Sequence, residues 1–265
     1  MTTTPTHPVM NFYGFARMPF DKDFESSDAF HSPSLSNAVA MLAFGVESED
    51  ILLVSGPIGS GKSVAIRSFI TALDPNRFAP IYLRGLGLSA ADLVKSVLLS
   101  LLIEPPYNYA KARALYFKSV AEHSHKPVVI IDDAQDMKES ALLSVKNLVN
   151  FNSDSKSKIT FILCGQPELK ETLRYSRLAS VHQRIRHWVE FSSLSLKDTC
   201  EYIDHAVAQA GRPSPVFSDN AKAEIHQRSL GLPRRINRIC LRTLFEGAAQ
   251  SRAIIDGANV VSDEV

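Results

Sequence analysis

The stretch Gly56–Ser63, with the sequence Gly-Pro-Ile-Gly-Ser-Gly-Lys-Ser, constrains the fold of this chain more than any other feature. It matches the pattern G-x-x-x-x-G-K-[ST]. The apolar, β-branched run 51–54 ahead of it predicts a buried strand, and apolar residues recur at helical spacing from Val64 to Leu73 behind it. A strand, a glycine loop and a helix N-terminus gather backbone N–H groups and the positive end of the helix dipole around one point. The sequence therefore predicts a triphosphate site at this loop.

The expected ligand is ATP with Mg²⁺. Lys62 would reach the β- and γ-phosphates, and the hydroxyl of Ser63 would ligate the metal. A glycine-rich turn that merely precedes Lys-Ser is the alternative, and the flanking strand and helix disfavour it. The residues expected to contact the nucleotide are Gly56, Pro57, Ile58, Gly59, Ser60, Gly61, Lys62, Ser63 and Val64.

The composition excludes several other classes of protein. Hydrophobic residues make up 45% and charged residues 22%, with a net charge of +1, so the overall charge does not indicate nucleic acid, although a local basic face is compatible with it. The three cysteines are far apart, which excludes a zinc motif or a disulfide framework. No apolar run approaches the roughly 20 residues that span a bilayer, and the N-terminus lacks a signal-peptide layout. We expect a cytoplasmic protein without a membrane partner.

Strands and helices alternate after the glycine loop. Apolar runs predict four further strands at 80–83, 128–131, 159–163 and 188–191. With 51–54 they predict an α/β fold, a parallel five-stranded sheet covered on both faces. From about Ser195 no strand candidate remains, and capping residues predict a small all-helical part, a lid. The expected domains are 1–47, an N-terminal aromatic segment and leading helix; 48–193, the nucleotide-binding core; and 194–265, the helical lid.

The N-terminal segment is rich in aromatic residues, and two interpretations of it remain open. It packs across the surface of the main domain, or part of it walls an adenine pocket. The aromatic residues concerned are Phe12, Tyr13, Phe15, Phe20, Phe24 and Phe30.

Polar residues follow two of the predicted strands. Asp132 would hold Mg²⁺, directly or through water, and Asp133 is placed to orient or deprotonate the attacking water. Two acids that merely end a strand are the alternative. After the next strand, Gln166 could reach the γ-phosphate or the water, or it could cap the following helix.

Two arginines lie outside these strand ends. Arg184, with Arg186 nearby, sits just before the last predicted strand, where it could enter the site of a neighbouring subunit as a finger. Arg234 begins a lid helix and could fold back on the γ-phosphate. For each, a solvated surface arginine is the alternative.

Five segments resemble, in order, those of ExeA-like AAA+ ATPases: the glycine loop, 130–135, 164–169, 183–185 and 231–238. The resemblance implies a P-loop AAA+ core with a helical lid, ATP at a subunit boundary and nucleotide-dependent homo-oligomers. It also implies that Gln166 is sensor 1, Arg184 the arginine finger and Arg234 sensor 2. The family usually has Asp-Glu where this chain has Asp132-Asp133. An aspartate is one methylene shorter, so we expect slow intrinsic ATP hydrolysis.

Such ATPases occur in two settings. One is assembly of a secretion apparatus, where the ATPase is joined to a membrane span and a cell-wall-binding domain. The other is DNA transposition, as in the MuB, TniB and TnsC group. Length and the lack of a membrane segment favour the second: ATP-dependent assembly on duplex DNA as a ring or helical filament, non-specific binding, target selection, and recruitment of a transposase or other mobile-element proteins. A secretion-type ATPase, a phage or plasmid helper ATPase and a small-molecule kinase are the alternatives.

Three groups of basic residues are candidates for DNA contact, with a solvated surface as the alternative for each. They are Arg84, Lys111, Arg113 and Lys118; Lys156 and Lys158; and Arg235, Arg238 and Arg242.

Overall fold

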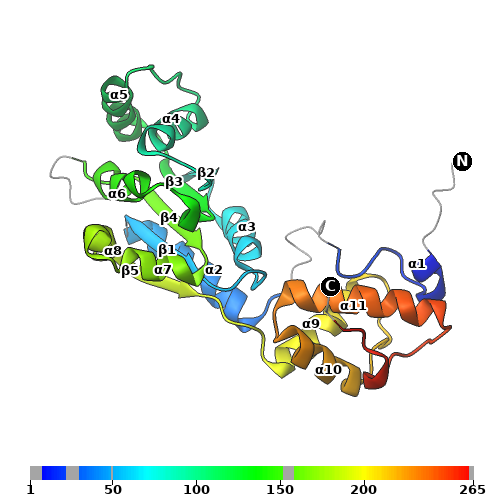
Figure 1. Ribbon diagram of the computed structural model, residues 1–265. Helices are drawn as coiled ribbons and strands as arrows, with labels where there is room; N and C mark the ends of the chain where they lie inside the picture. The colour runs from blue at the N-terminus through cyan, green and yellow to red at the C-terminus, as the bar shows by residue number, and fades with distance from the viewer. Residues whose placement is uncertain (1–7, 22–29, 49, 152–157, 263–265) are drawn as a thin grey trace, which may run out of the picture. The chain divides into compact units, whose positions relative to one another are not determined.

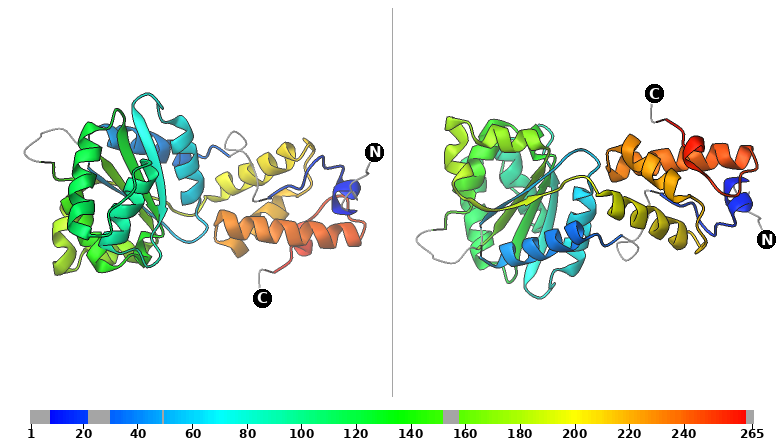
Figure 2. Two further views of the ribbon diagram at one scale, coloured as in Figure 1. Left: turned by 90° about the horizontal axis from the view of Figure 1, so that it is seen from above. Right: turned by 90° about the horizontal axis from the view of Figure 1, so that it is seen from below.

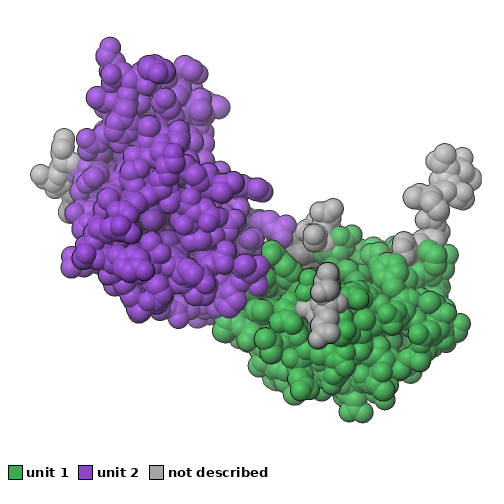
Figure 3. All heavy atoms as spheres, in the orientation of Figure 1, with its two compact units in different colours: residues 1–35, 59–61, 192–265 green, residues 36–58, 62–191 purple. Residues whose placement is uncertain are grey.

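The computed structural model describes residues 8–21, 30–48, 50–151 and 158–262. These residues fall into two compact units (Figure 3). Unit 1 spans 1–35, 59–61 and 192–265, and unit 2 spans 36–58 and 62–191. The division into domains 1–47, 48–193 and 194–265 stays a prediction.

Unit 2 is built on a parallel sheet that contains five strands in the described part of the chain (Figure 1). Their order is β2-β3-β4-β1-β5, and every neighbouring pair is parallel. The expected α/β class and strand number are therefore confirmed. The strands are β1 (Ile51–Ser55), β2 (Phe78–Arg84), β3 (Lys126–Asp132), β4 (Thr160–Gly165) and β5 (Ile185–Glu190). The sequence had placed Arg186 just before the last strand. This prediction is wrong, because β5 begins at Ile185 and Arg186 lies within it.

Helices follow the strands, as the predicted alternation of strands and helices requires, and the sequence did not predict α8 or η2. Ser89 caps α4, where its hydroxyl accepts from the Asp92 amide while the Asp92 carboxylate accepts from the Ser89 amide. The helices of unit 2 are α2 (Pro33–Ser48), α3 (Lys62–Ala72), α4 (Ala90–Ser100), α5 (Tyr109–Glu122), α6 (Glu139–Leu148), α7 (Pro167–Leu173) and α8 (Ala179–His182), and a short 3₁₀ helix, η2 (Ala134–Asp136), follows β3. Most of α2 belongs to unit 2, which begins at residue 36.

Alternation along the strands divides the core of unit 2 between the two faces of the sheet. Ile51 and Leu53 pack with the buried apolar residues of α4 to α8. Leu52 points the other way, toward α2, where a methyl group on Gly45 would lie only 2.6 Å from its Cδ2 atom. Figure 2 shows α2 and α3 on one side of the sheet and α6 and α8 on the other. Helices on both faces leave the strand ends free for function.

Unit 1 is helical, as predicted for the C-terminal part. It contains α9 (Leu196–Gln209), α10 (Asp219–Ser229), α11 (Pro233–Ala249), α1 (Pro8–Tyr13) and a last 3₁₀ helix, Gly257–Asn259. Ser195 and Ser218 cap α9 and α10 by accepting from the backbone amides three residues on. Within the described residues, no helix is both long enough and apolar enough to cross a membrane.

The N-terminal aromatic segment packs in unit 1. Val9, Tyr13, Phe15 and Phe20 belong to one apolar cluster with residues of α9, α10 and α11. The Tyr13 hydroxyl donates to the Arg252 carbonyl at 3.1 Å, and Arg212 Nη1 donates to the Tyr13 carbonyl at 2.6 Å. The expectation that this segment crosses the main domain is therefore wrong for these residues.

Two further aromatic residues of this segment are Phe24 and Phe30. Phe30 contacts Tyr202 and His205 of α9, and Phe24 lies outside the described residues. A role in an adenine pocket stays a prediction.

Candidate nucleotide-binding site

The glycine loop joins the end of β1 to the start of α3. Gly59 and Gly61 have φ values of +79° and +104°, a region that side chains with a Cβ rarely adopt. The two glycines let the chain turn sharply before α3 begins at Lys62. Ile58 and Ser63 are exposed, whereas Gly56 is buried and donates to the Gly165 carbonyl of β4 at 3.3 Å. The loop is therefore fixed to two neighbouring strands.

Polar groups of the loop fit an anionic ligand. Lys62 Nζ donates to the carbonyls of Gly56 and Pro57 at 2.7 and 2.9 Å, which keeps the ammonium group over the loop. Ser60 Oγ is buried and has no hydrogen-bond partner among the described residues. A buried hydroxyl without a partner is costly, so its position favours a ligand that supplies an acceptor. The residues present fit a phosphate chain.

Asp132 ends β3 at the same edge of the sheet. Its Oδ2 atom accepts from the Tyr82 hydroxyl of β2 at 2.6 Å, and Oδ1 accepts from the Asp133 amide at 3.0 Å. Burial raises the pKa of Tyr82, and this hydrogen bond raises it further. Carboxylate and hydroxyl oxygens are the ligands that Mg²⁺ prefers, so Asp132 and Ser63 fit the expected metal. No local sequence pattern indicates the Tyr82 contact.

The charges of Lys62 and Asp132 both act on the thiol of Cys164 in β4. Burial raises its pKa, the negative charge of Asp132 raises it further, and the ammonium group of Lys62 lowers it. Lys62 and Asp132 therefore both lie near Cys164. The carboxyl ends of β1, β4 and β3 lie side by side, because these three strands are parallel neighbours in the sheet.

Asp133 turns the chain out of β3. Its φ and ψ of 52° and 44° are in the left-handed region, which aspartate tolerates better than most residues. A Cβ on Gly85, the residue after β2, would lie 2.4 Å from the Asp133 carbonyl oxygen, so the two loops pack tightly. The carboxylate is exposed, and its Oδ1 accepts from Gln135 Nε2 at 3.3 Å. Its role toward water stays a prediction.

Gln166 occupies the N-cap position of α7. Among the described residues, its side chain makes no capping hydrogen bond, so the capping interpretation is not supported. Its backbone amide instead donates to Gln135 Oε1 at 3.1 Å. Gln135 is a site residue to which the sequence analysis gave no role. Its Nε2 also donates to Asp136 Oδ2 at 3.3 Å.

Arg184 lies between α8 and β5, at the amino-terminal ends of the strands, whereas the glycine loop lies at their carboxyl ends. Its Nη1 atom is 3.9 Å from Asp50 Oδ2, just before β1. The parallel register pairs Ile185 with Ile51, whereas the glycine loop follows the other end of β1. A strand of five residues spans about 17 Å, more than an arginine side chain can bridge. Arg184 is thus poorly placed to reach the glycine loop of its own chain.

Arg234 is the second residue of α11 in unit 1. Its assignment as sensor 2 stays a prediction.

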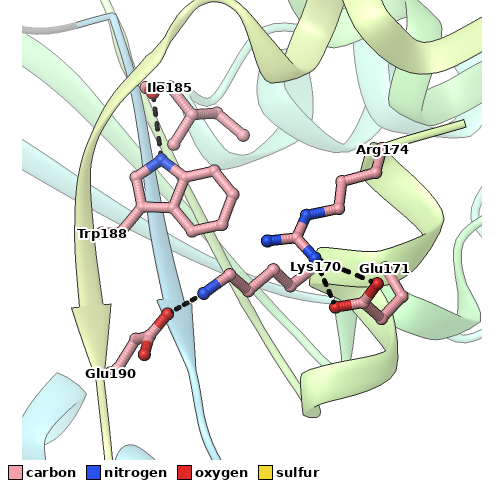
Figure 4. A network of polar contacts seen from close by, with 6 residues as sticks. All are labelled: Lys170, Glu171, Arg174, Ile185, Trp188 and Glu190. Carbon is pink, nitrogen blue, oxygen red and sulfur yellow. Dashed lines mark hydrogen bonds and ion pairs between the residues drawn. The ribbon is translucent and has the colours of Figure 1, made fainter. Parts of the chain in front are cut away.

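The sequence also did not predict a network of polar contacts between α7 and β5 (Figure 4). Lys170 forms an ion pair with Glu190, and its Nζ atom lies 4.9 Å from the ring centre of Trp188. Lys170 and Glu190 also help to line a cavity of about 310 Å³ beside Gly56 and Pro57. Lys170 and Glu190 are more than 100 positions from the glycine loop in the sequence, so no local pattern predicts this contact.

Residues 46–173 match the family model described as "AAA domain". This region of the chain is similar to AAA domains. It includes the glycine loop, Asp132, Asp133 and Gln166, and the match supports ATP binding and hydrolysis at the family level, typically with Mg²⁺.

A curated relative extends the likeness beyond the AAA domain. The chain is 28% identical over 255 residues to general secretion pathway protein A of Aeromonas hydrophila. The match covers 93% of this chain and 46% of the relative, so the chain spans slightly less than half of that protein. The match supports the resemblance to ExeA-like AAA+ ATPases.

Solved structures confirm the AAA+ fold. Cdc6p of Pyrobaculum aerophilum aligns with a TM-score of 0.69 at 16% identity, covering 89% of this chain and 67% of its own. The ORC2 protein of Aeropyrum pernix aligns with a TM-score of 0.66 at 12% identity, covering 91% and 69%. The RuvB Holliday junction branch migration motor of Thermotoga maritima aligns with a TM-score of 0.58 at 18% identity, covering 85% and 64%. At these identities the likeness shows the fold alone.

Proposed function

We propose that this chain is an ATPase that binds Mg²⁺–ATP at the glycine loop and uses hydrolysis to control the assembly of its own copies. The observation that carries the proposal is the meeting of Lys62, Asp132 and Asp133 at one edge of the sheet, beside the glycine loop. When bound, ATP would supply the phosphoryl group and Mg²⁺ would neutralise the charge that develops on the phosphate oxygens. Lys62 would bind the phosphates, Ser63 and Asp132 would hold the metal, and Asp133 would orient the attacking water.

Assembly is the part of the proposal that rests on Arg184. Because this arginine lies at the amino-terminal ends of the strands, opposite the glycine loop, its charge is available to a neighbouring subunit rather than to its own nucleotide. A site completed in this way hydrolyses ATP faster in the assembled state than in the separate subunit. We therefore propose a homo-oligomer, as a ring or a helical filament.

The setting that we favour is the assembly of a secretion apparatus. The likeness to general secretion pathway protein A supports this alternative over transposition. Duplex DNA, a transposase and other mobile-element proteins as partners stay predictions. Among the candidate DNA contacts, Lys111, Arg113 and Lys118 lie on α5, and Lys156 lies outside the described residues.

One experiment separates these settings. Light scattering and negative-stain imaging would follow the purified chain with an ATP analogue, with ADP and without nucleotide, each with and without duplex DNA. We expect assembly that requires the analogue and proceeds without DNA. Assembly that requires DNA, and falls steeply as salt rises, would favour the transposition setting. No nucleotide-dependent assembly under any condition would contradict the proposal.

Replacing Asp133 with glutamate tests the expected slow hydrolysis. Asp133→Glu extends the carboxylate by one methylene toward the position usual in the family, so we expect basal phosphate release to rise by about tenfold or more. The measurement is steady-state phosphate release at saturating ATP, with Asp198→Glu on α9 as the matched control. An unchanged or lower rate in Asp133→Glu, with the fold intact by circular dichroism, would show that aspartate does not limit turnover.

A further inference from the structure

The side chain of Gln135 connects the loop after β3 with the loop after β4. From η2 it makes three hydrogen bonds: Nε2 to Asp133 Oδ1 at 3.3 Å, Nε2 to Asp136 Oδ2 at 3.3 Å, and Oε1 from the Gln166 amide at 3.1 Å. Asp133 and Gln166 are the two residues expected to act on the attacking water, and they are 33 positions apart in the sequence. One half-buried amide group thus joins both of them.

The chemistry of its partners fixes the orientation of this amide. A backbone N–H can only donate, so the atom that faces Gln166 must be the carbonyl oxygen. The NH₂ group then faces the carboxylates of Asp133 and Asp136, where it supplies one hydrogen to each. The flipped amide would place an N–H against an N–H and an oxygen between two carboxylates. Gln135 therefore has one satisfied orientation.

Packing confines the same side chain. A Cβ on Gly165 would lie 2.7 Å from Gln135 Oε1 and 2.7 Å from Leu169 Cδ2, so β4 approaches the amide closely at a residue without a side chain. Asp133, by contrast, is exposed, and its backbone is in the left-handed region directly after β3. An exposed carboxylate that rotates freely would not keep a water in line for attack. Gln135 supplies the constraint.

We infer that Gln135 is a positioning residue, which holds the Asp133 carboxylate at a fixed place relative to Gln166 and so sets the rate of hydrolysis without contacting the nucleotide. The inference rests on the proposed ATP hydrolysis. It predicts that loss of the donor at residue 135 lowers kcat and leaves the affinity for ATP unchanged.

Two variants at residue 135 separate donation to Asp133 from acceptance from Gln166. Gln135→Glu keeps the shape of the side chain and an acceptor for the Gln166 amide, but it replaces the donor with a negative charge beside Asp133 and Asp136. Gln135→Leu removes both functions. The matched control is Gln250→Glu, the same change at an exposed residue that ends α11.

The kinetic measurement combines single-turnover phosphate release with titration of a fluorescent ATP analogue. We expect both variants to lower the hydrolysis rate by about 10- to 100-fold, a size usual for residues that orient a reacting group, while the Kd for the analogue changes by less than about threefold. Gln250→Glu should match the wild type in both. Equal loss of rate and affinity would assign Gln135 to general stability and overturn the inference.

A second readout does not depend on activity. In the nucleotide-free protein, the exchange of the Gln166 backbone amide can be followed by NMR. Gln135→Glu should keep its protection because an oxygen acceptor remains, and Gln135→Leu should lose it. Protection that survives in Gln135→Leu would overturn the bridge itself.

The outcomes also distinguish this inference from the proposed function. A wild-type chain that releases no phosphate would contradict the proposed function. A wild-type chain that hydrolyses ATP, with Gln135→Glu doing so at the same rate, would overturn only the positioning role of Gln135.

Discussion

Lys62→Ala is expected to abolish ATP binding and, with it, nucleotide-dependent assembly. The Lys62 ammonium group is held over the glycine loop by the carbonyls of Gly56 and Pro57, where a phosphate would meet it. A hydrogen bond to a charged group contributes about 1.5–3 kcal/mol, so the loss of two phosphate contacts weakens binding by about 100-fold or more. Titration with a fluorescent ATP analogue measures the loss, and light scattering reports assembly.

The control for this prediction is Lys197→Ala. Lys197 is an exposed residue of α9 that pairs only loosely with Glu201, at 3.8 Å, so its removal should leave ATP affinity unchanged. The melting temperature of Lys62→Ala must also be measured, because Lys62 bonds two loop carbonyls without nucleotide. A well-folded Lys62→Ala protein that binds ATP as the wild type does would show that the glycine loop is not the nucleotide site.

Arg184→Ala is expected to keep ATP affinity and lose the hydrolysis that assembly stimulates. An arginine finger contributes about 10³-fold or more to phosphoryl transfer, and this one lies too far from the glycine loop of its own chain to act there. Phosphate release by the wild type should therefore rise with protein concentration, whereas release by Arg184→Ala should stay at the basal rate. Basal rates should be equal.

Mixing variants tests whether Arg184 acts between subunits. Asp133→Asn, which is expected to bind ATP without hydrolysing it, still carries the finger, and Arg184→Ala still carries an intact site. Mixed assemblies should hydrolyse ATP faster than either variant alone. Arg77→Ala is the matched control, since Arg77 also pairs with a surface carboxylate, Glu47, and directly precedes a strand, β2, which lies at the other edge of the sheet from β5. Normal stimulated turnover in Arg184→Ala would reject the finger assignment.

Local patterns were sufficient to predict most of the fold. The apolar runs at 51–54 and 128–131 are buried strands because both faces of the sheet are covered, and Ser195 and Ser218 cap helices through bonds to residues three positions away. Gly59 and Gly61 indicate the glycine loop in the sequence because few other residues adopt their positive φ values. In each case the pattern that predicts the element lies within the element or a few residues from it.

Contacts between distant segments were not predictable in the same way. Tyr82 meets Asp132 because β2 and β3 pair in parallel, and 50 residues separate the two partners. Gln135 meets Gln166 because β3 and β4 are neighbours in the sheet, which spacing alone does not tell. The aromatic composition of the N-terminal segment predicts that its side chains are buried, but it does not specify which surface they pack against.

The packing of Tyr13, Phe15 and Phe20 in unit 1 dictates an order of events during synthesis. Their partners on α9, α10 and α11 begin near residue 196, whereas the strands of unit 2 are complete at Glu190. At roughly 5–20 residues per second, the ribosome needs about 9 to 35 s to make the chain from Phe20 to Leu196. The five strands of unit 2 are synthesised during that interval, before the partners of the first aromatic side chains exist. A nascent chain arrested before α9 would therefore display this segment to chaperones.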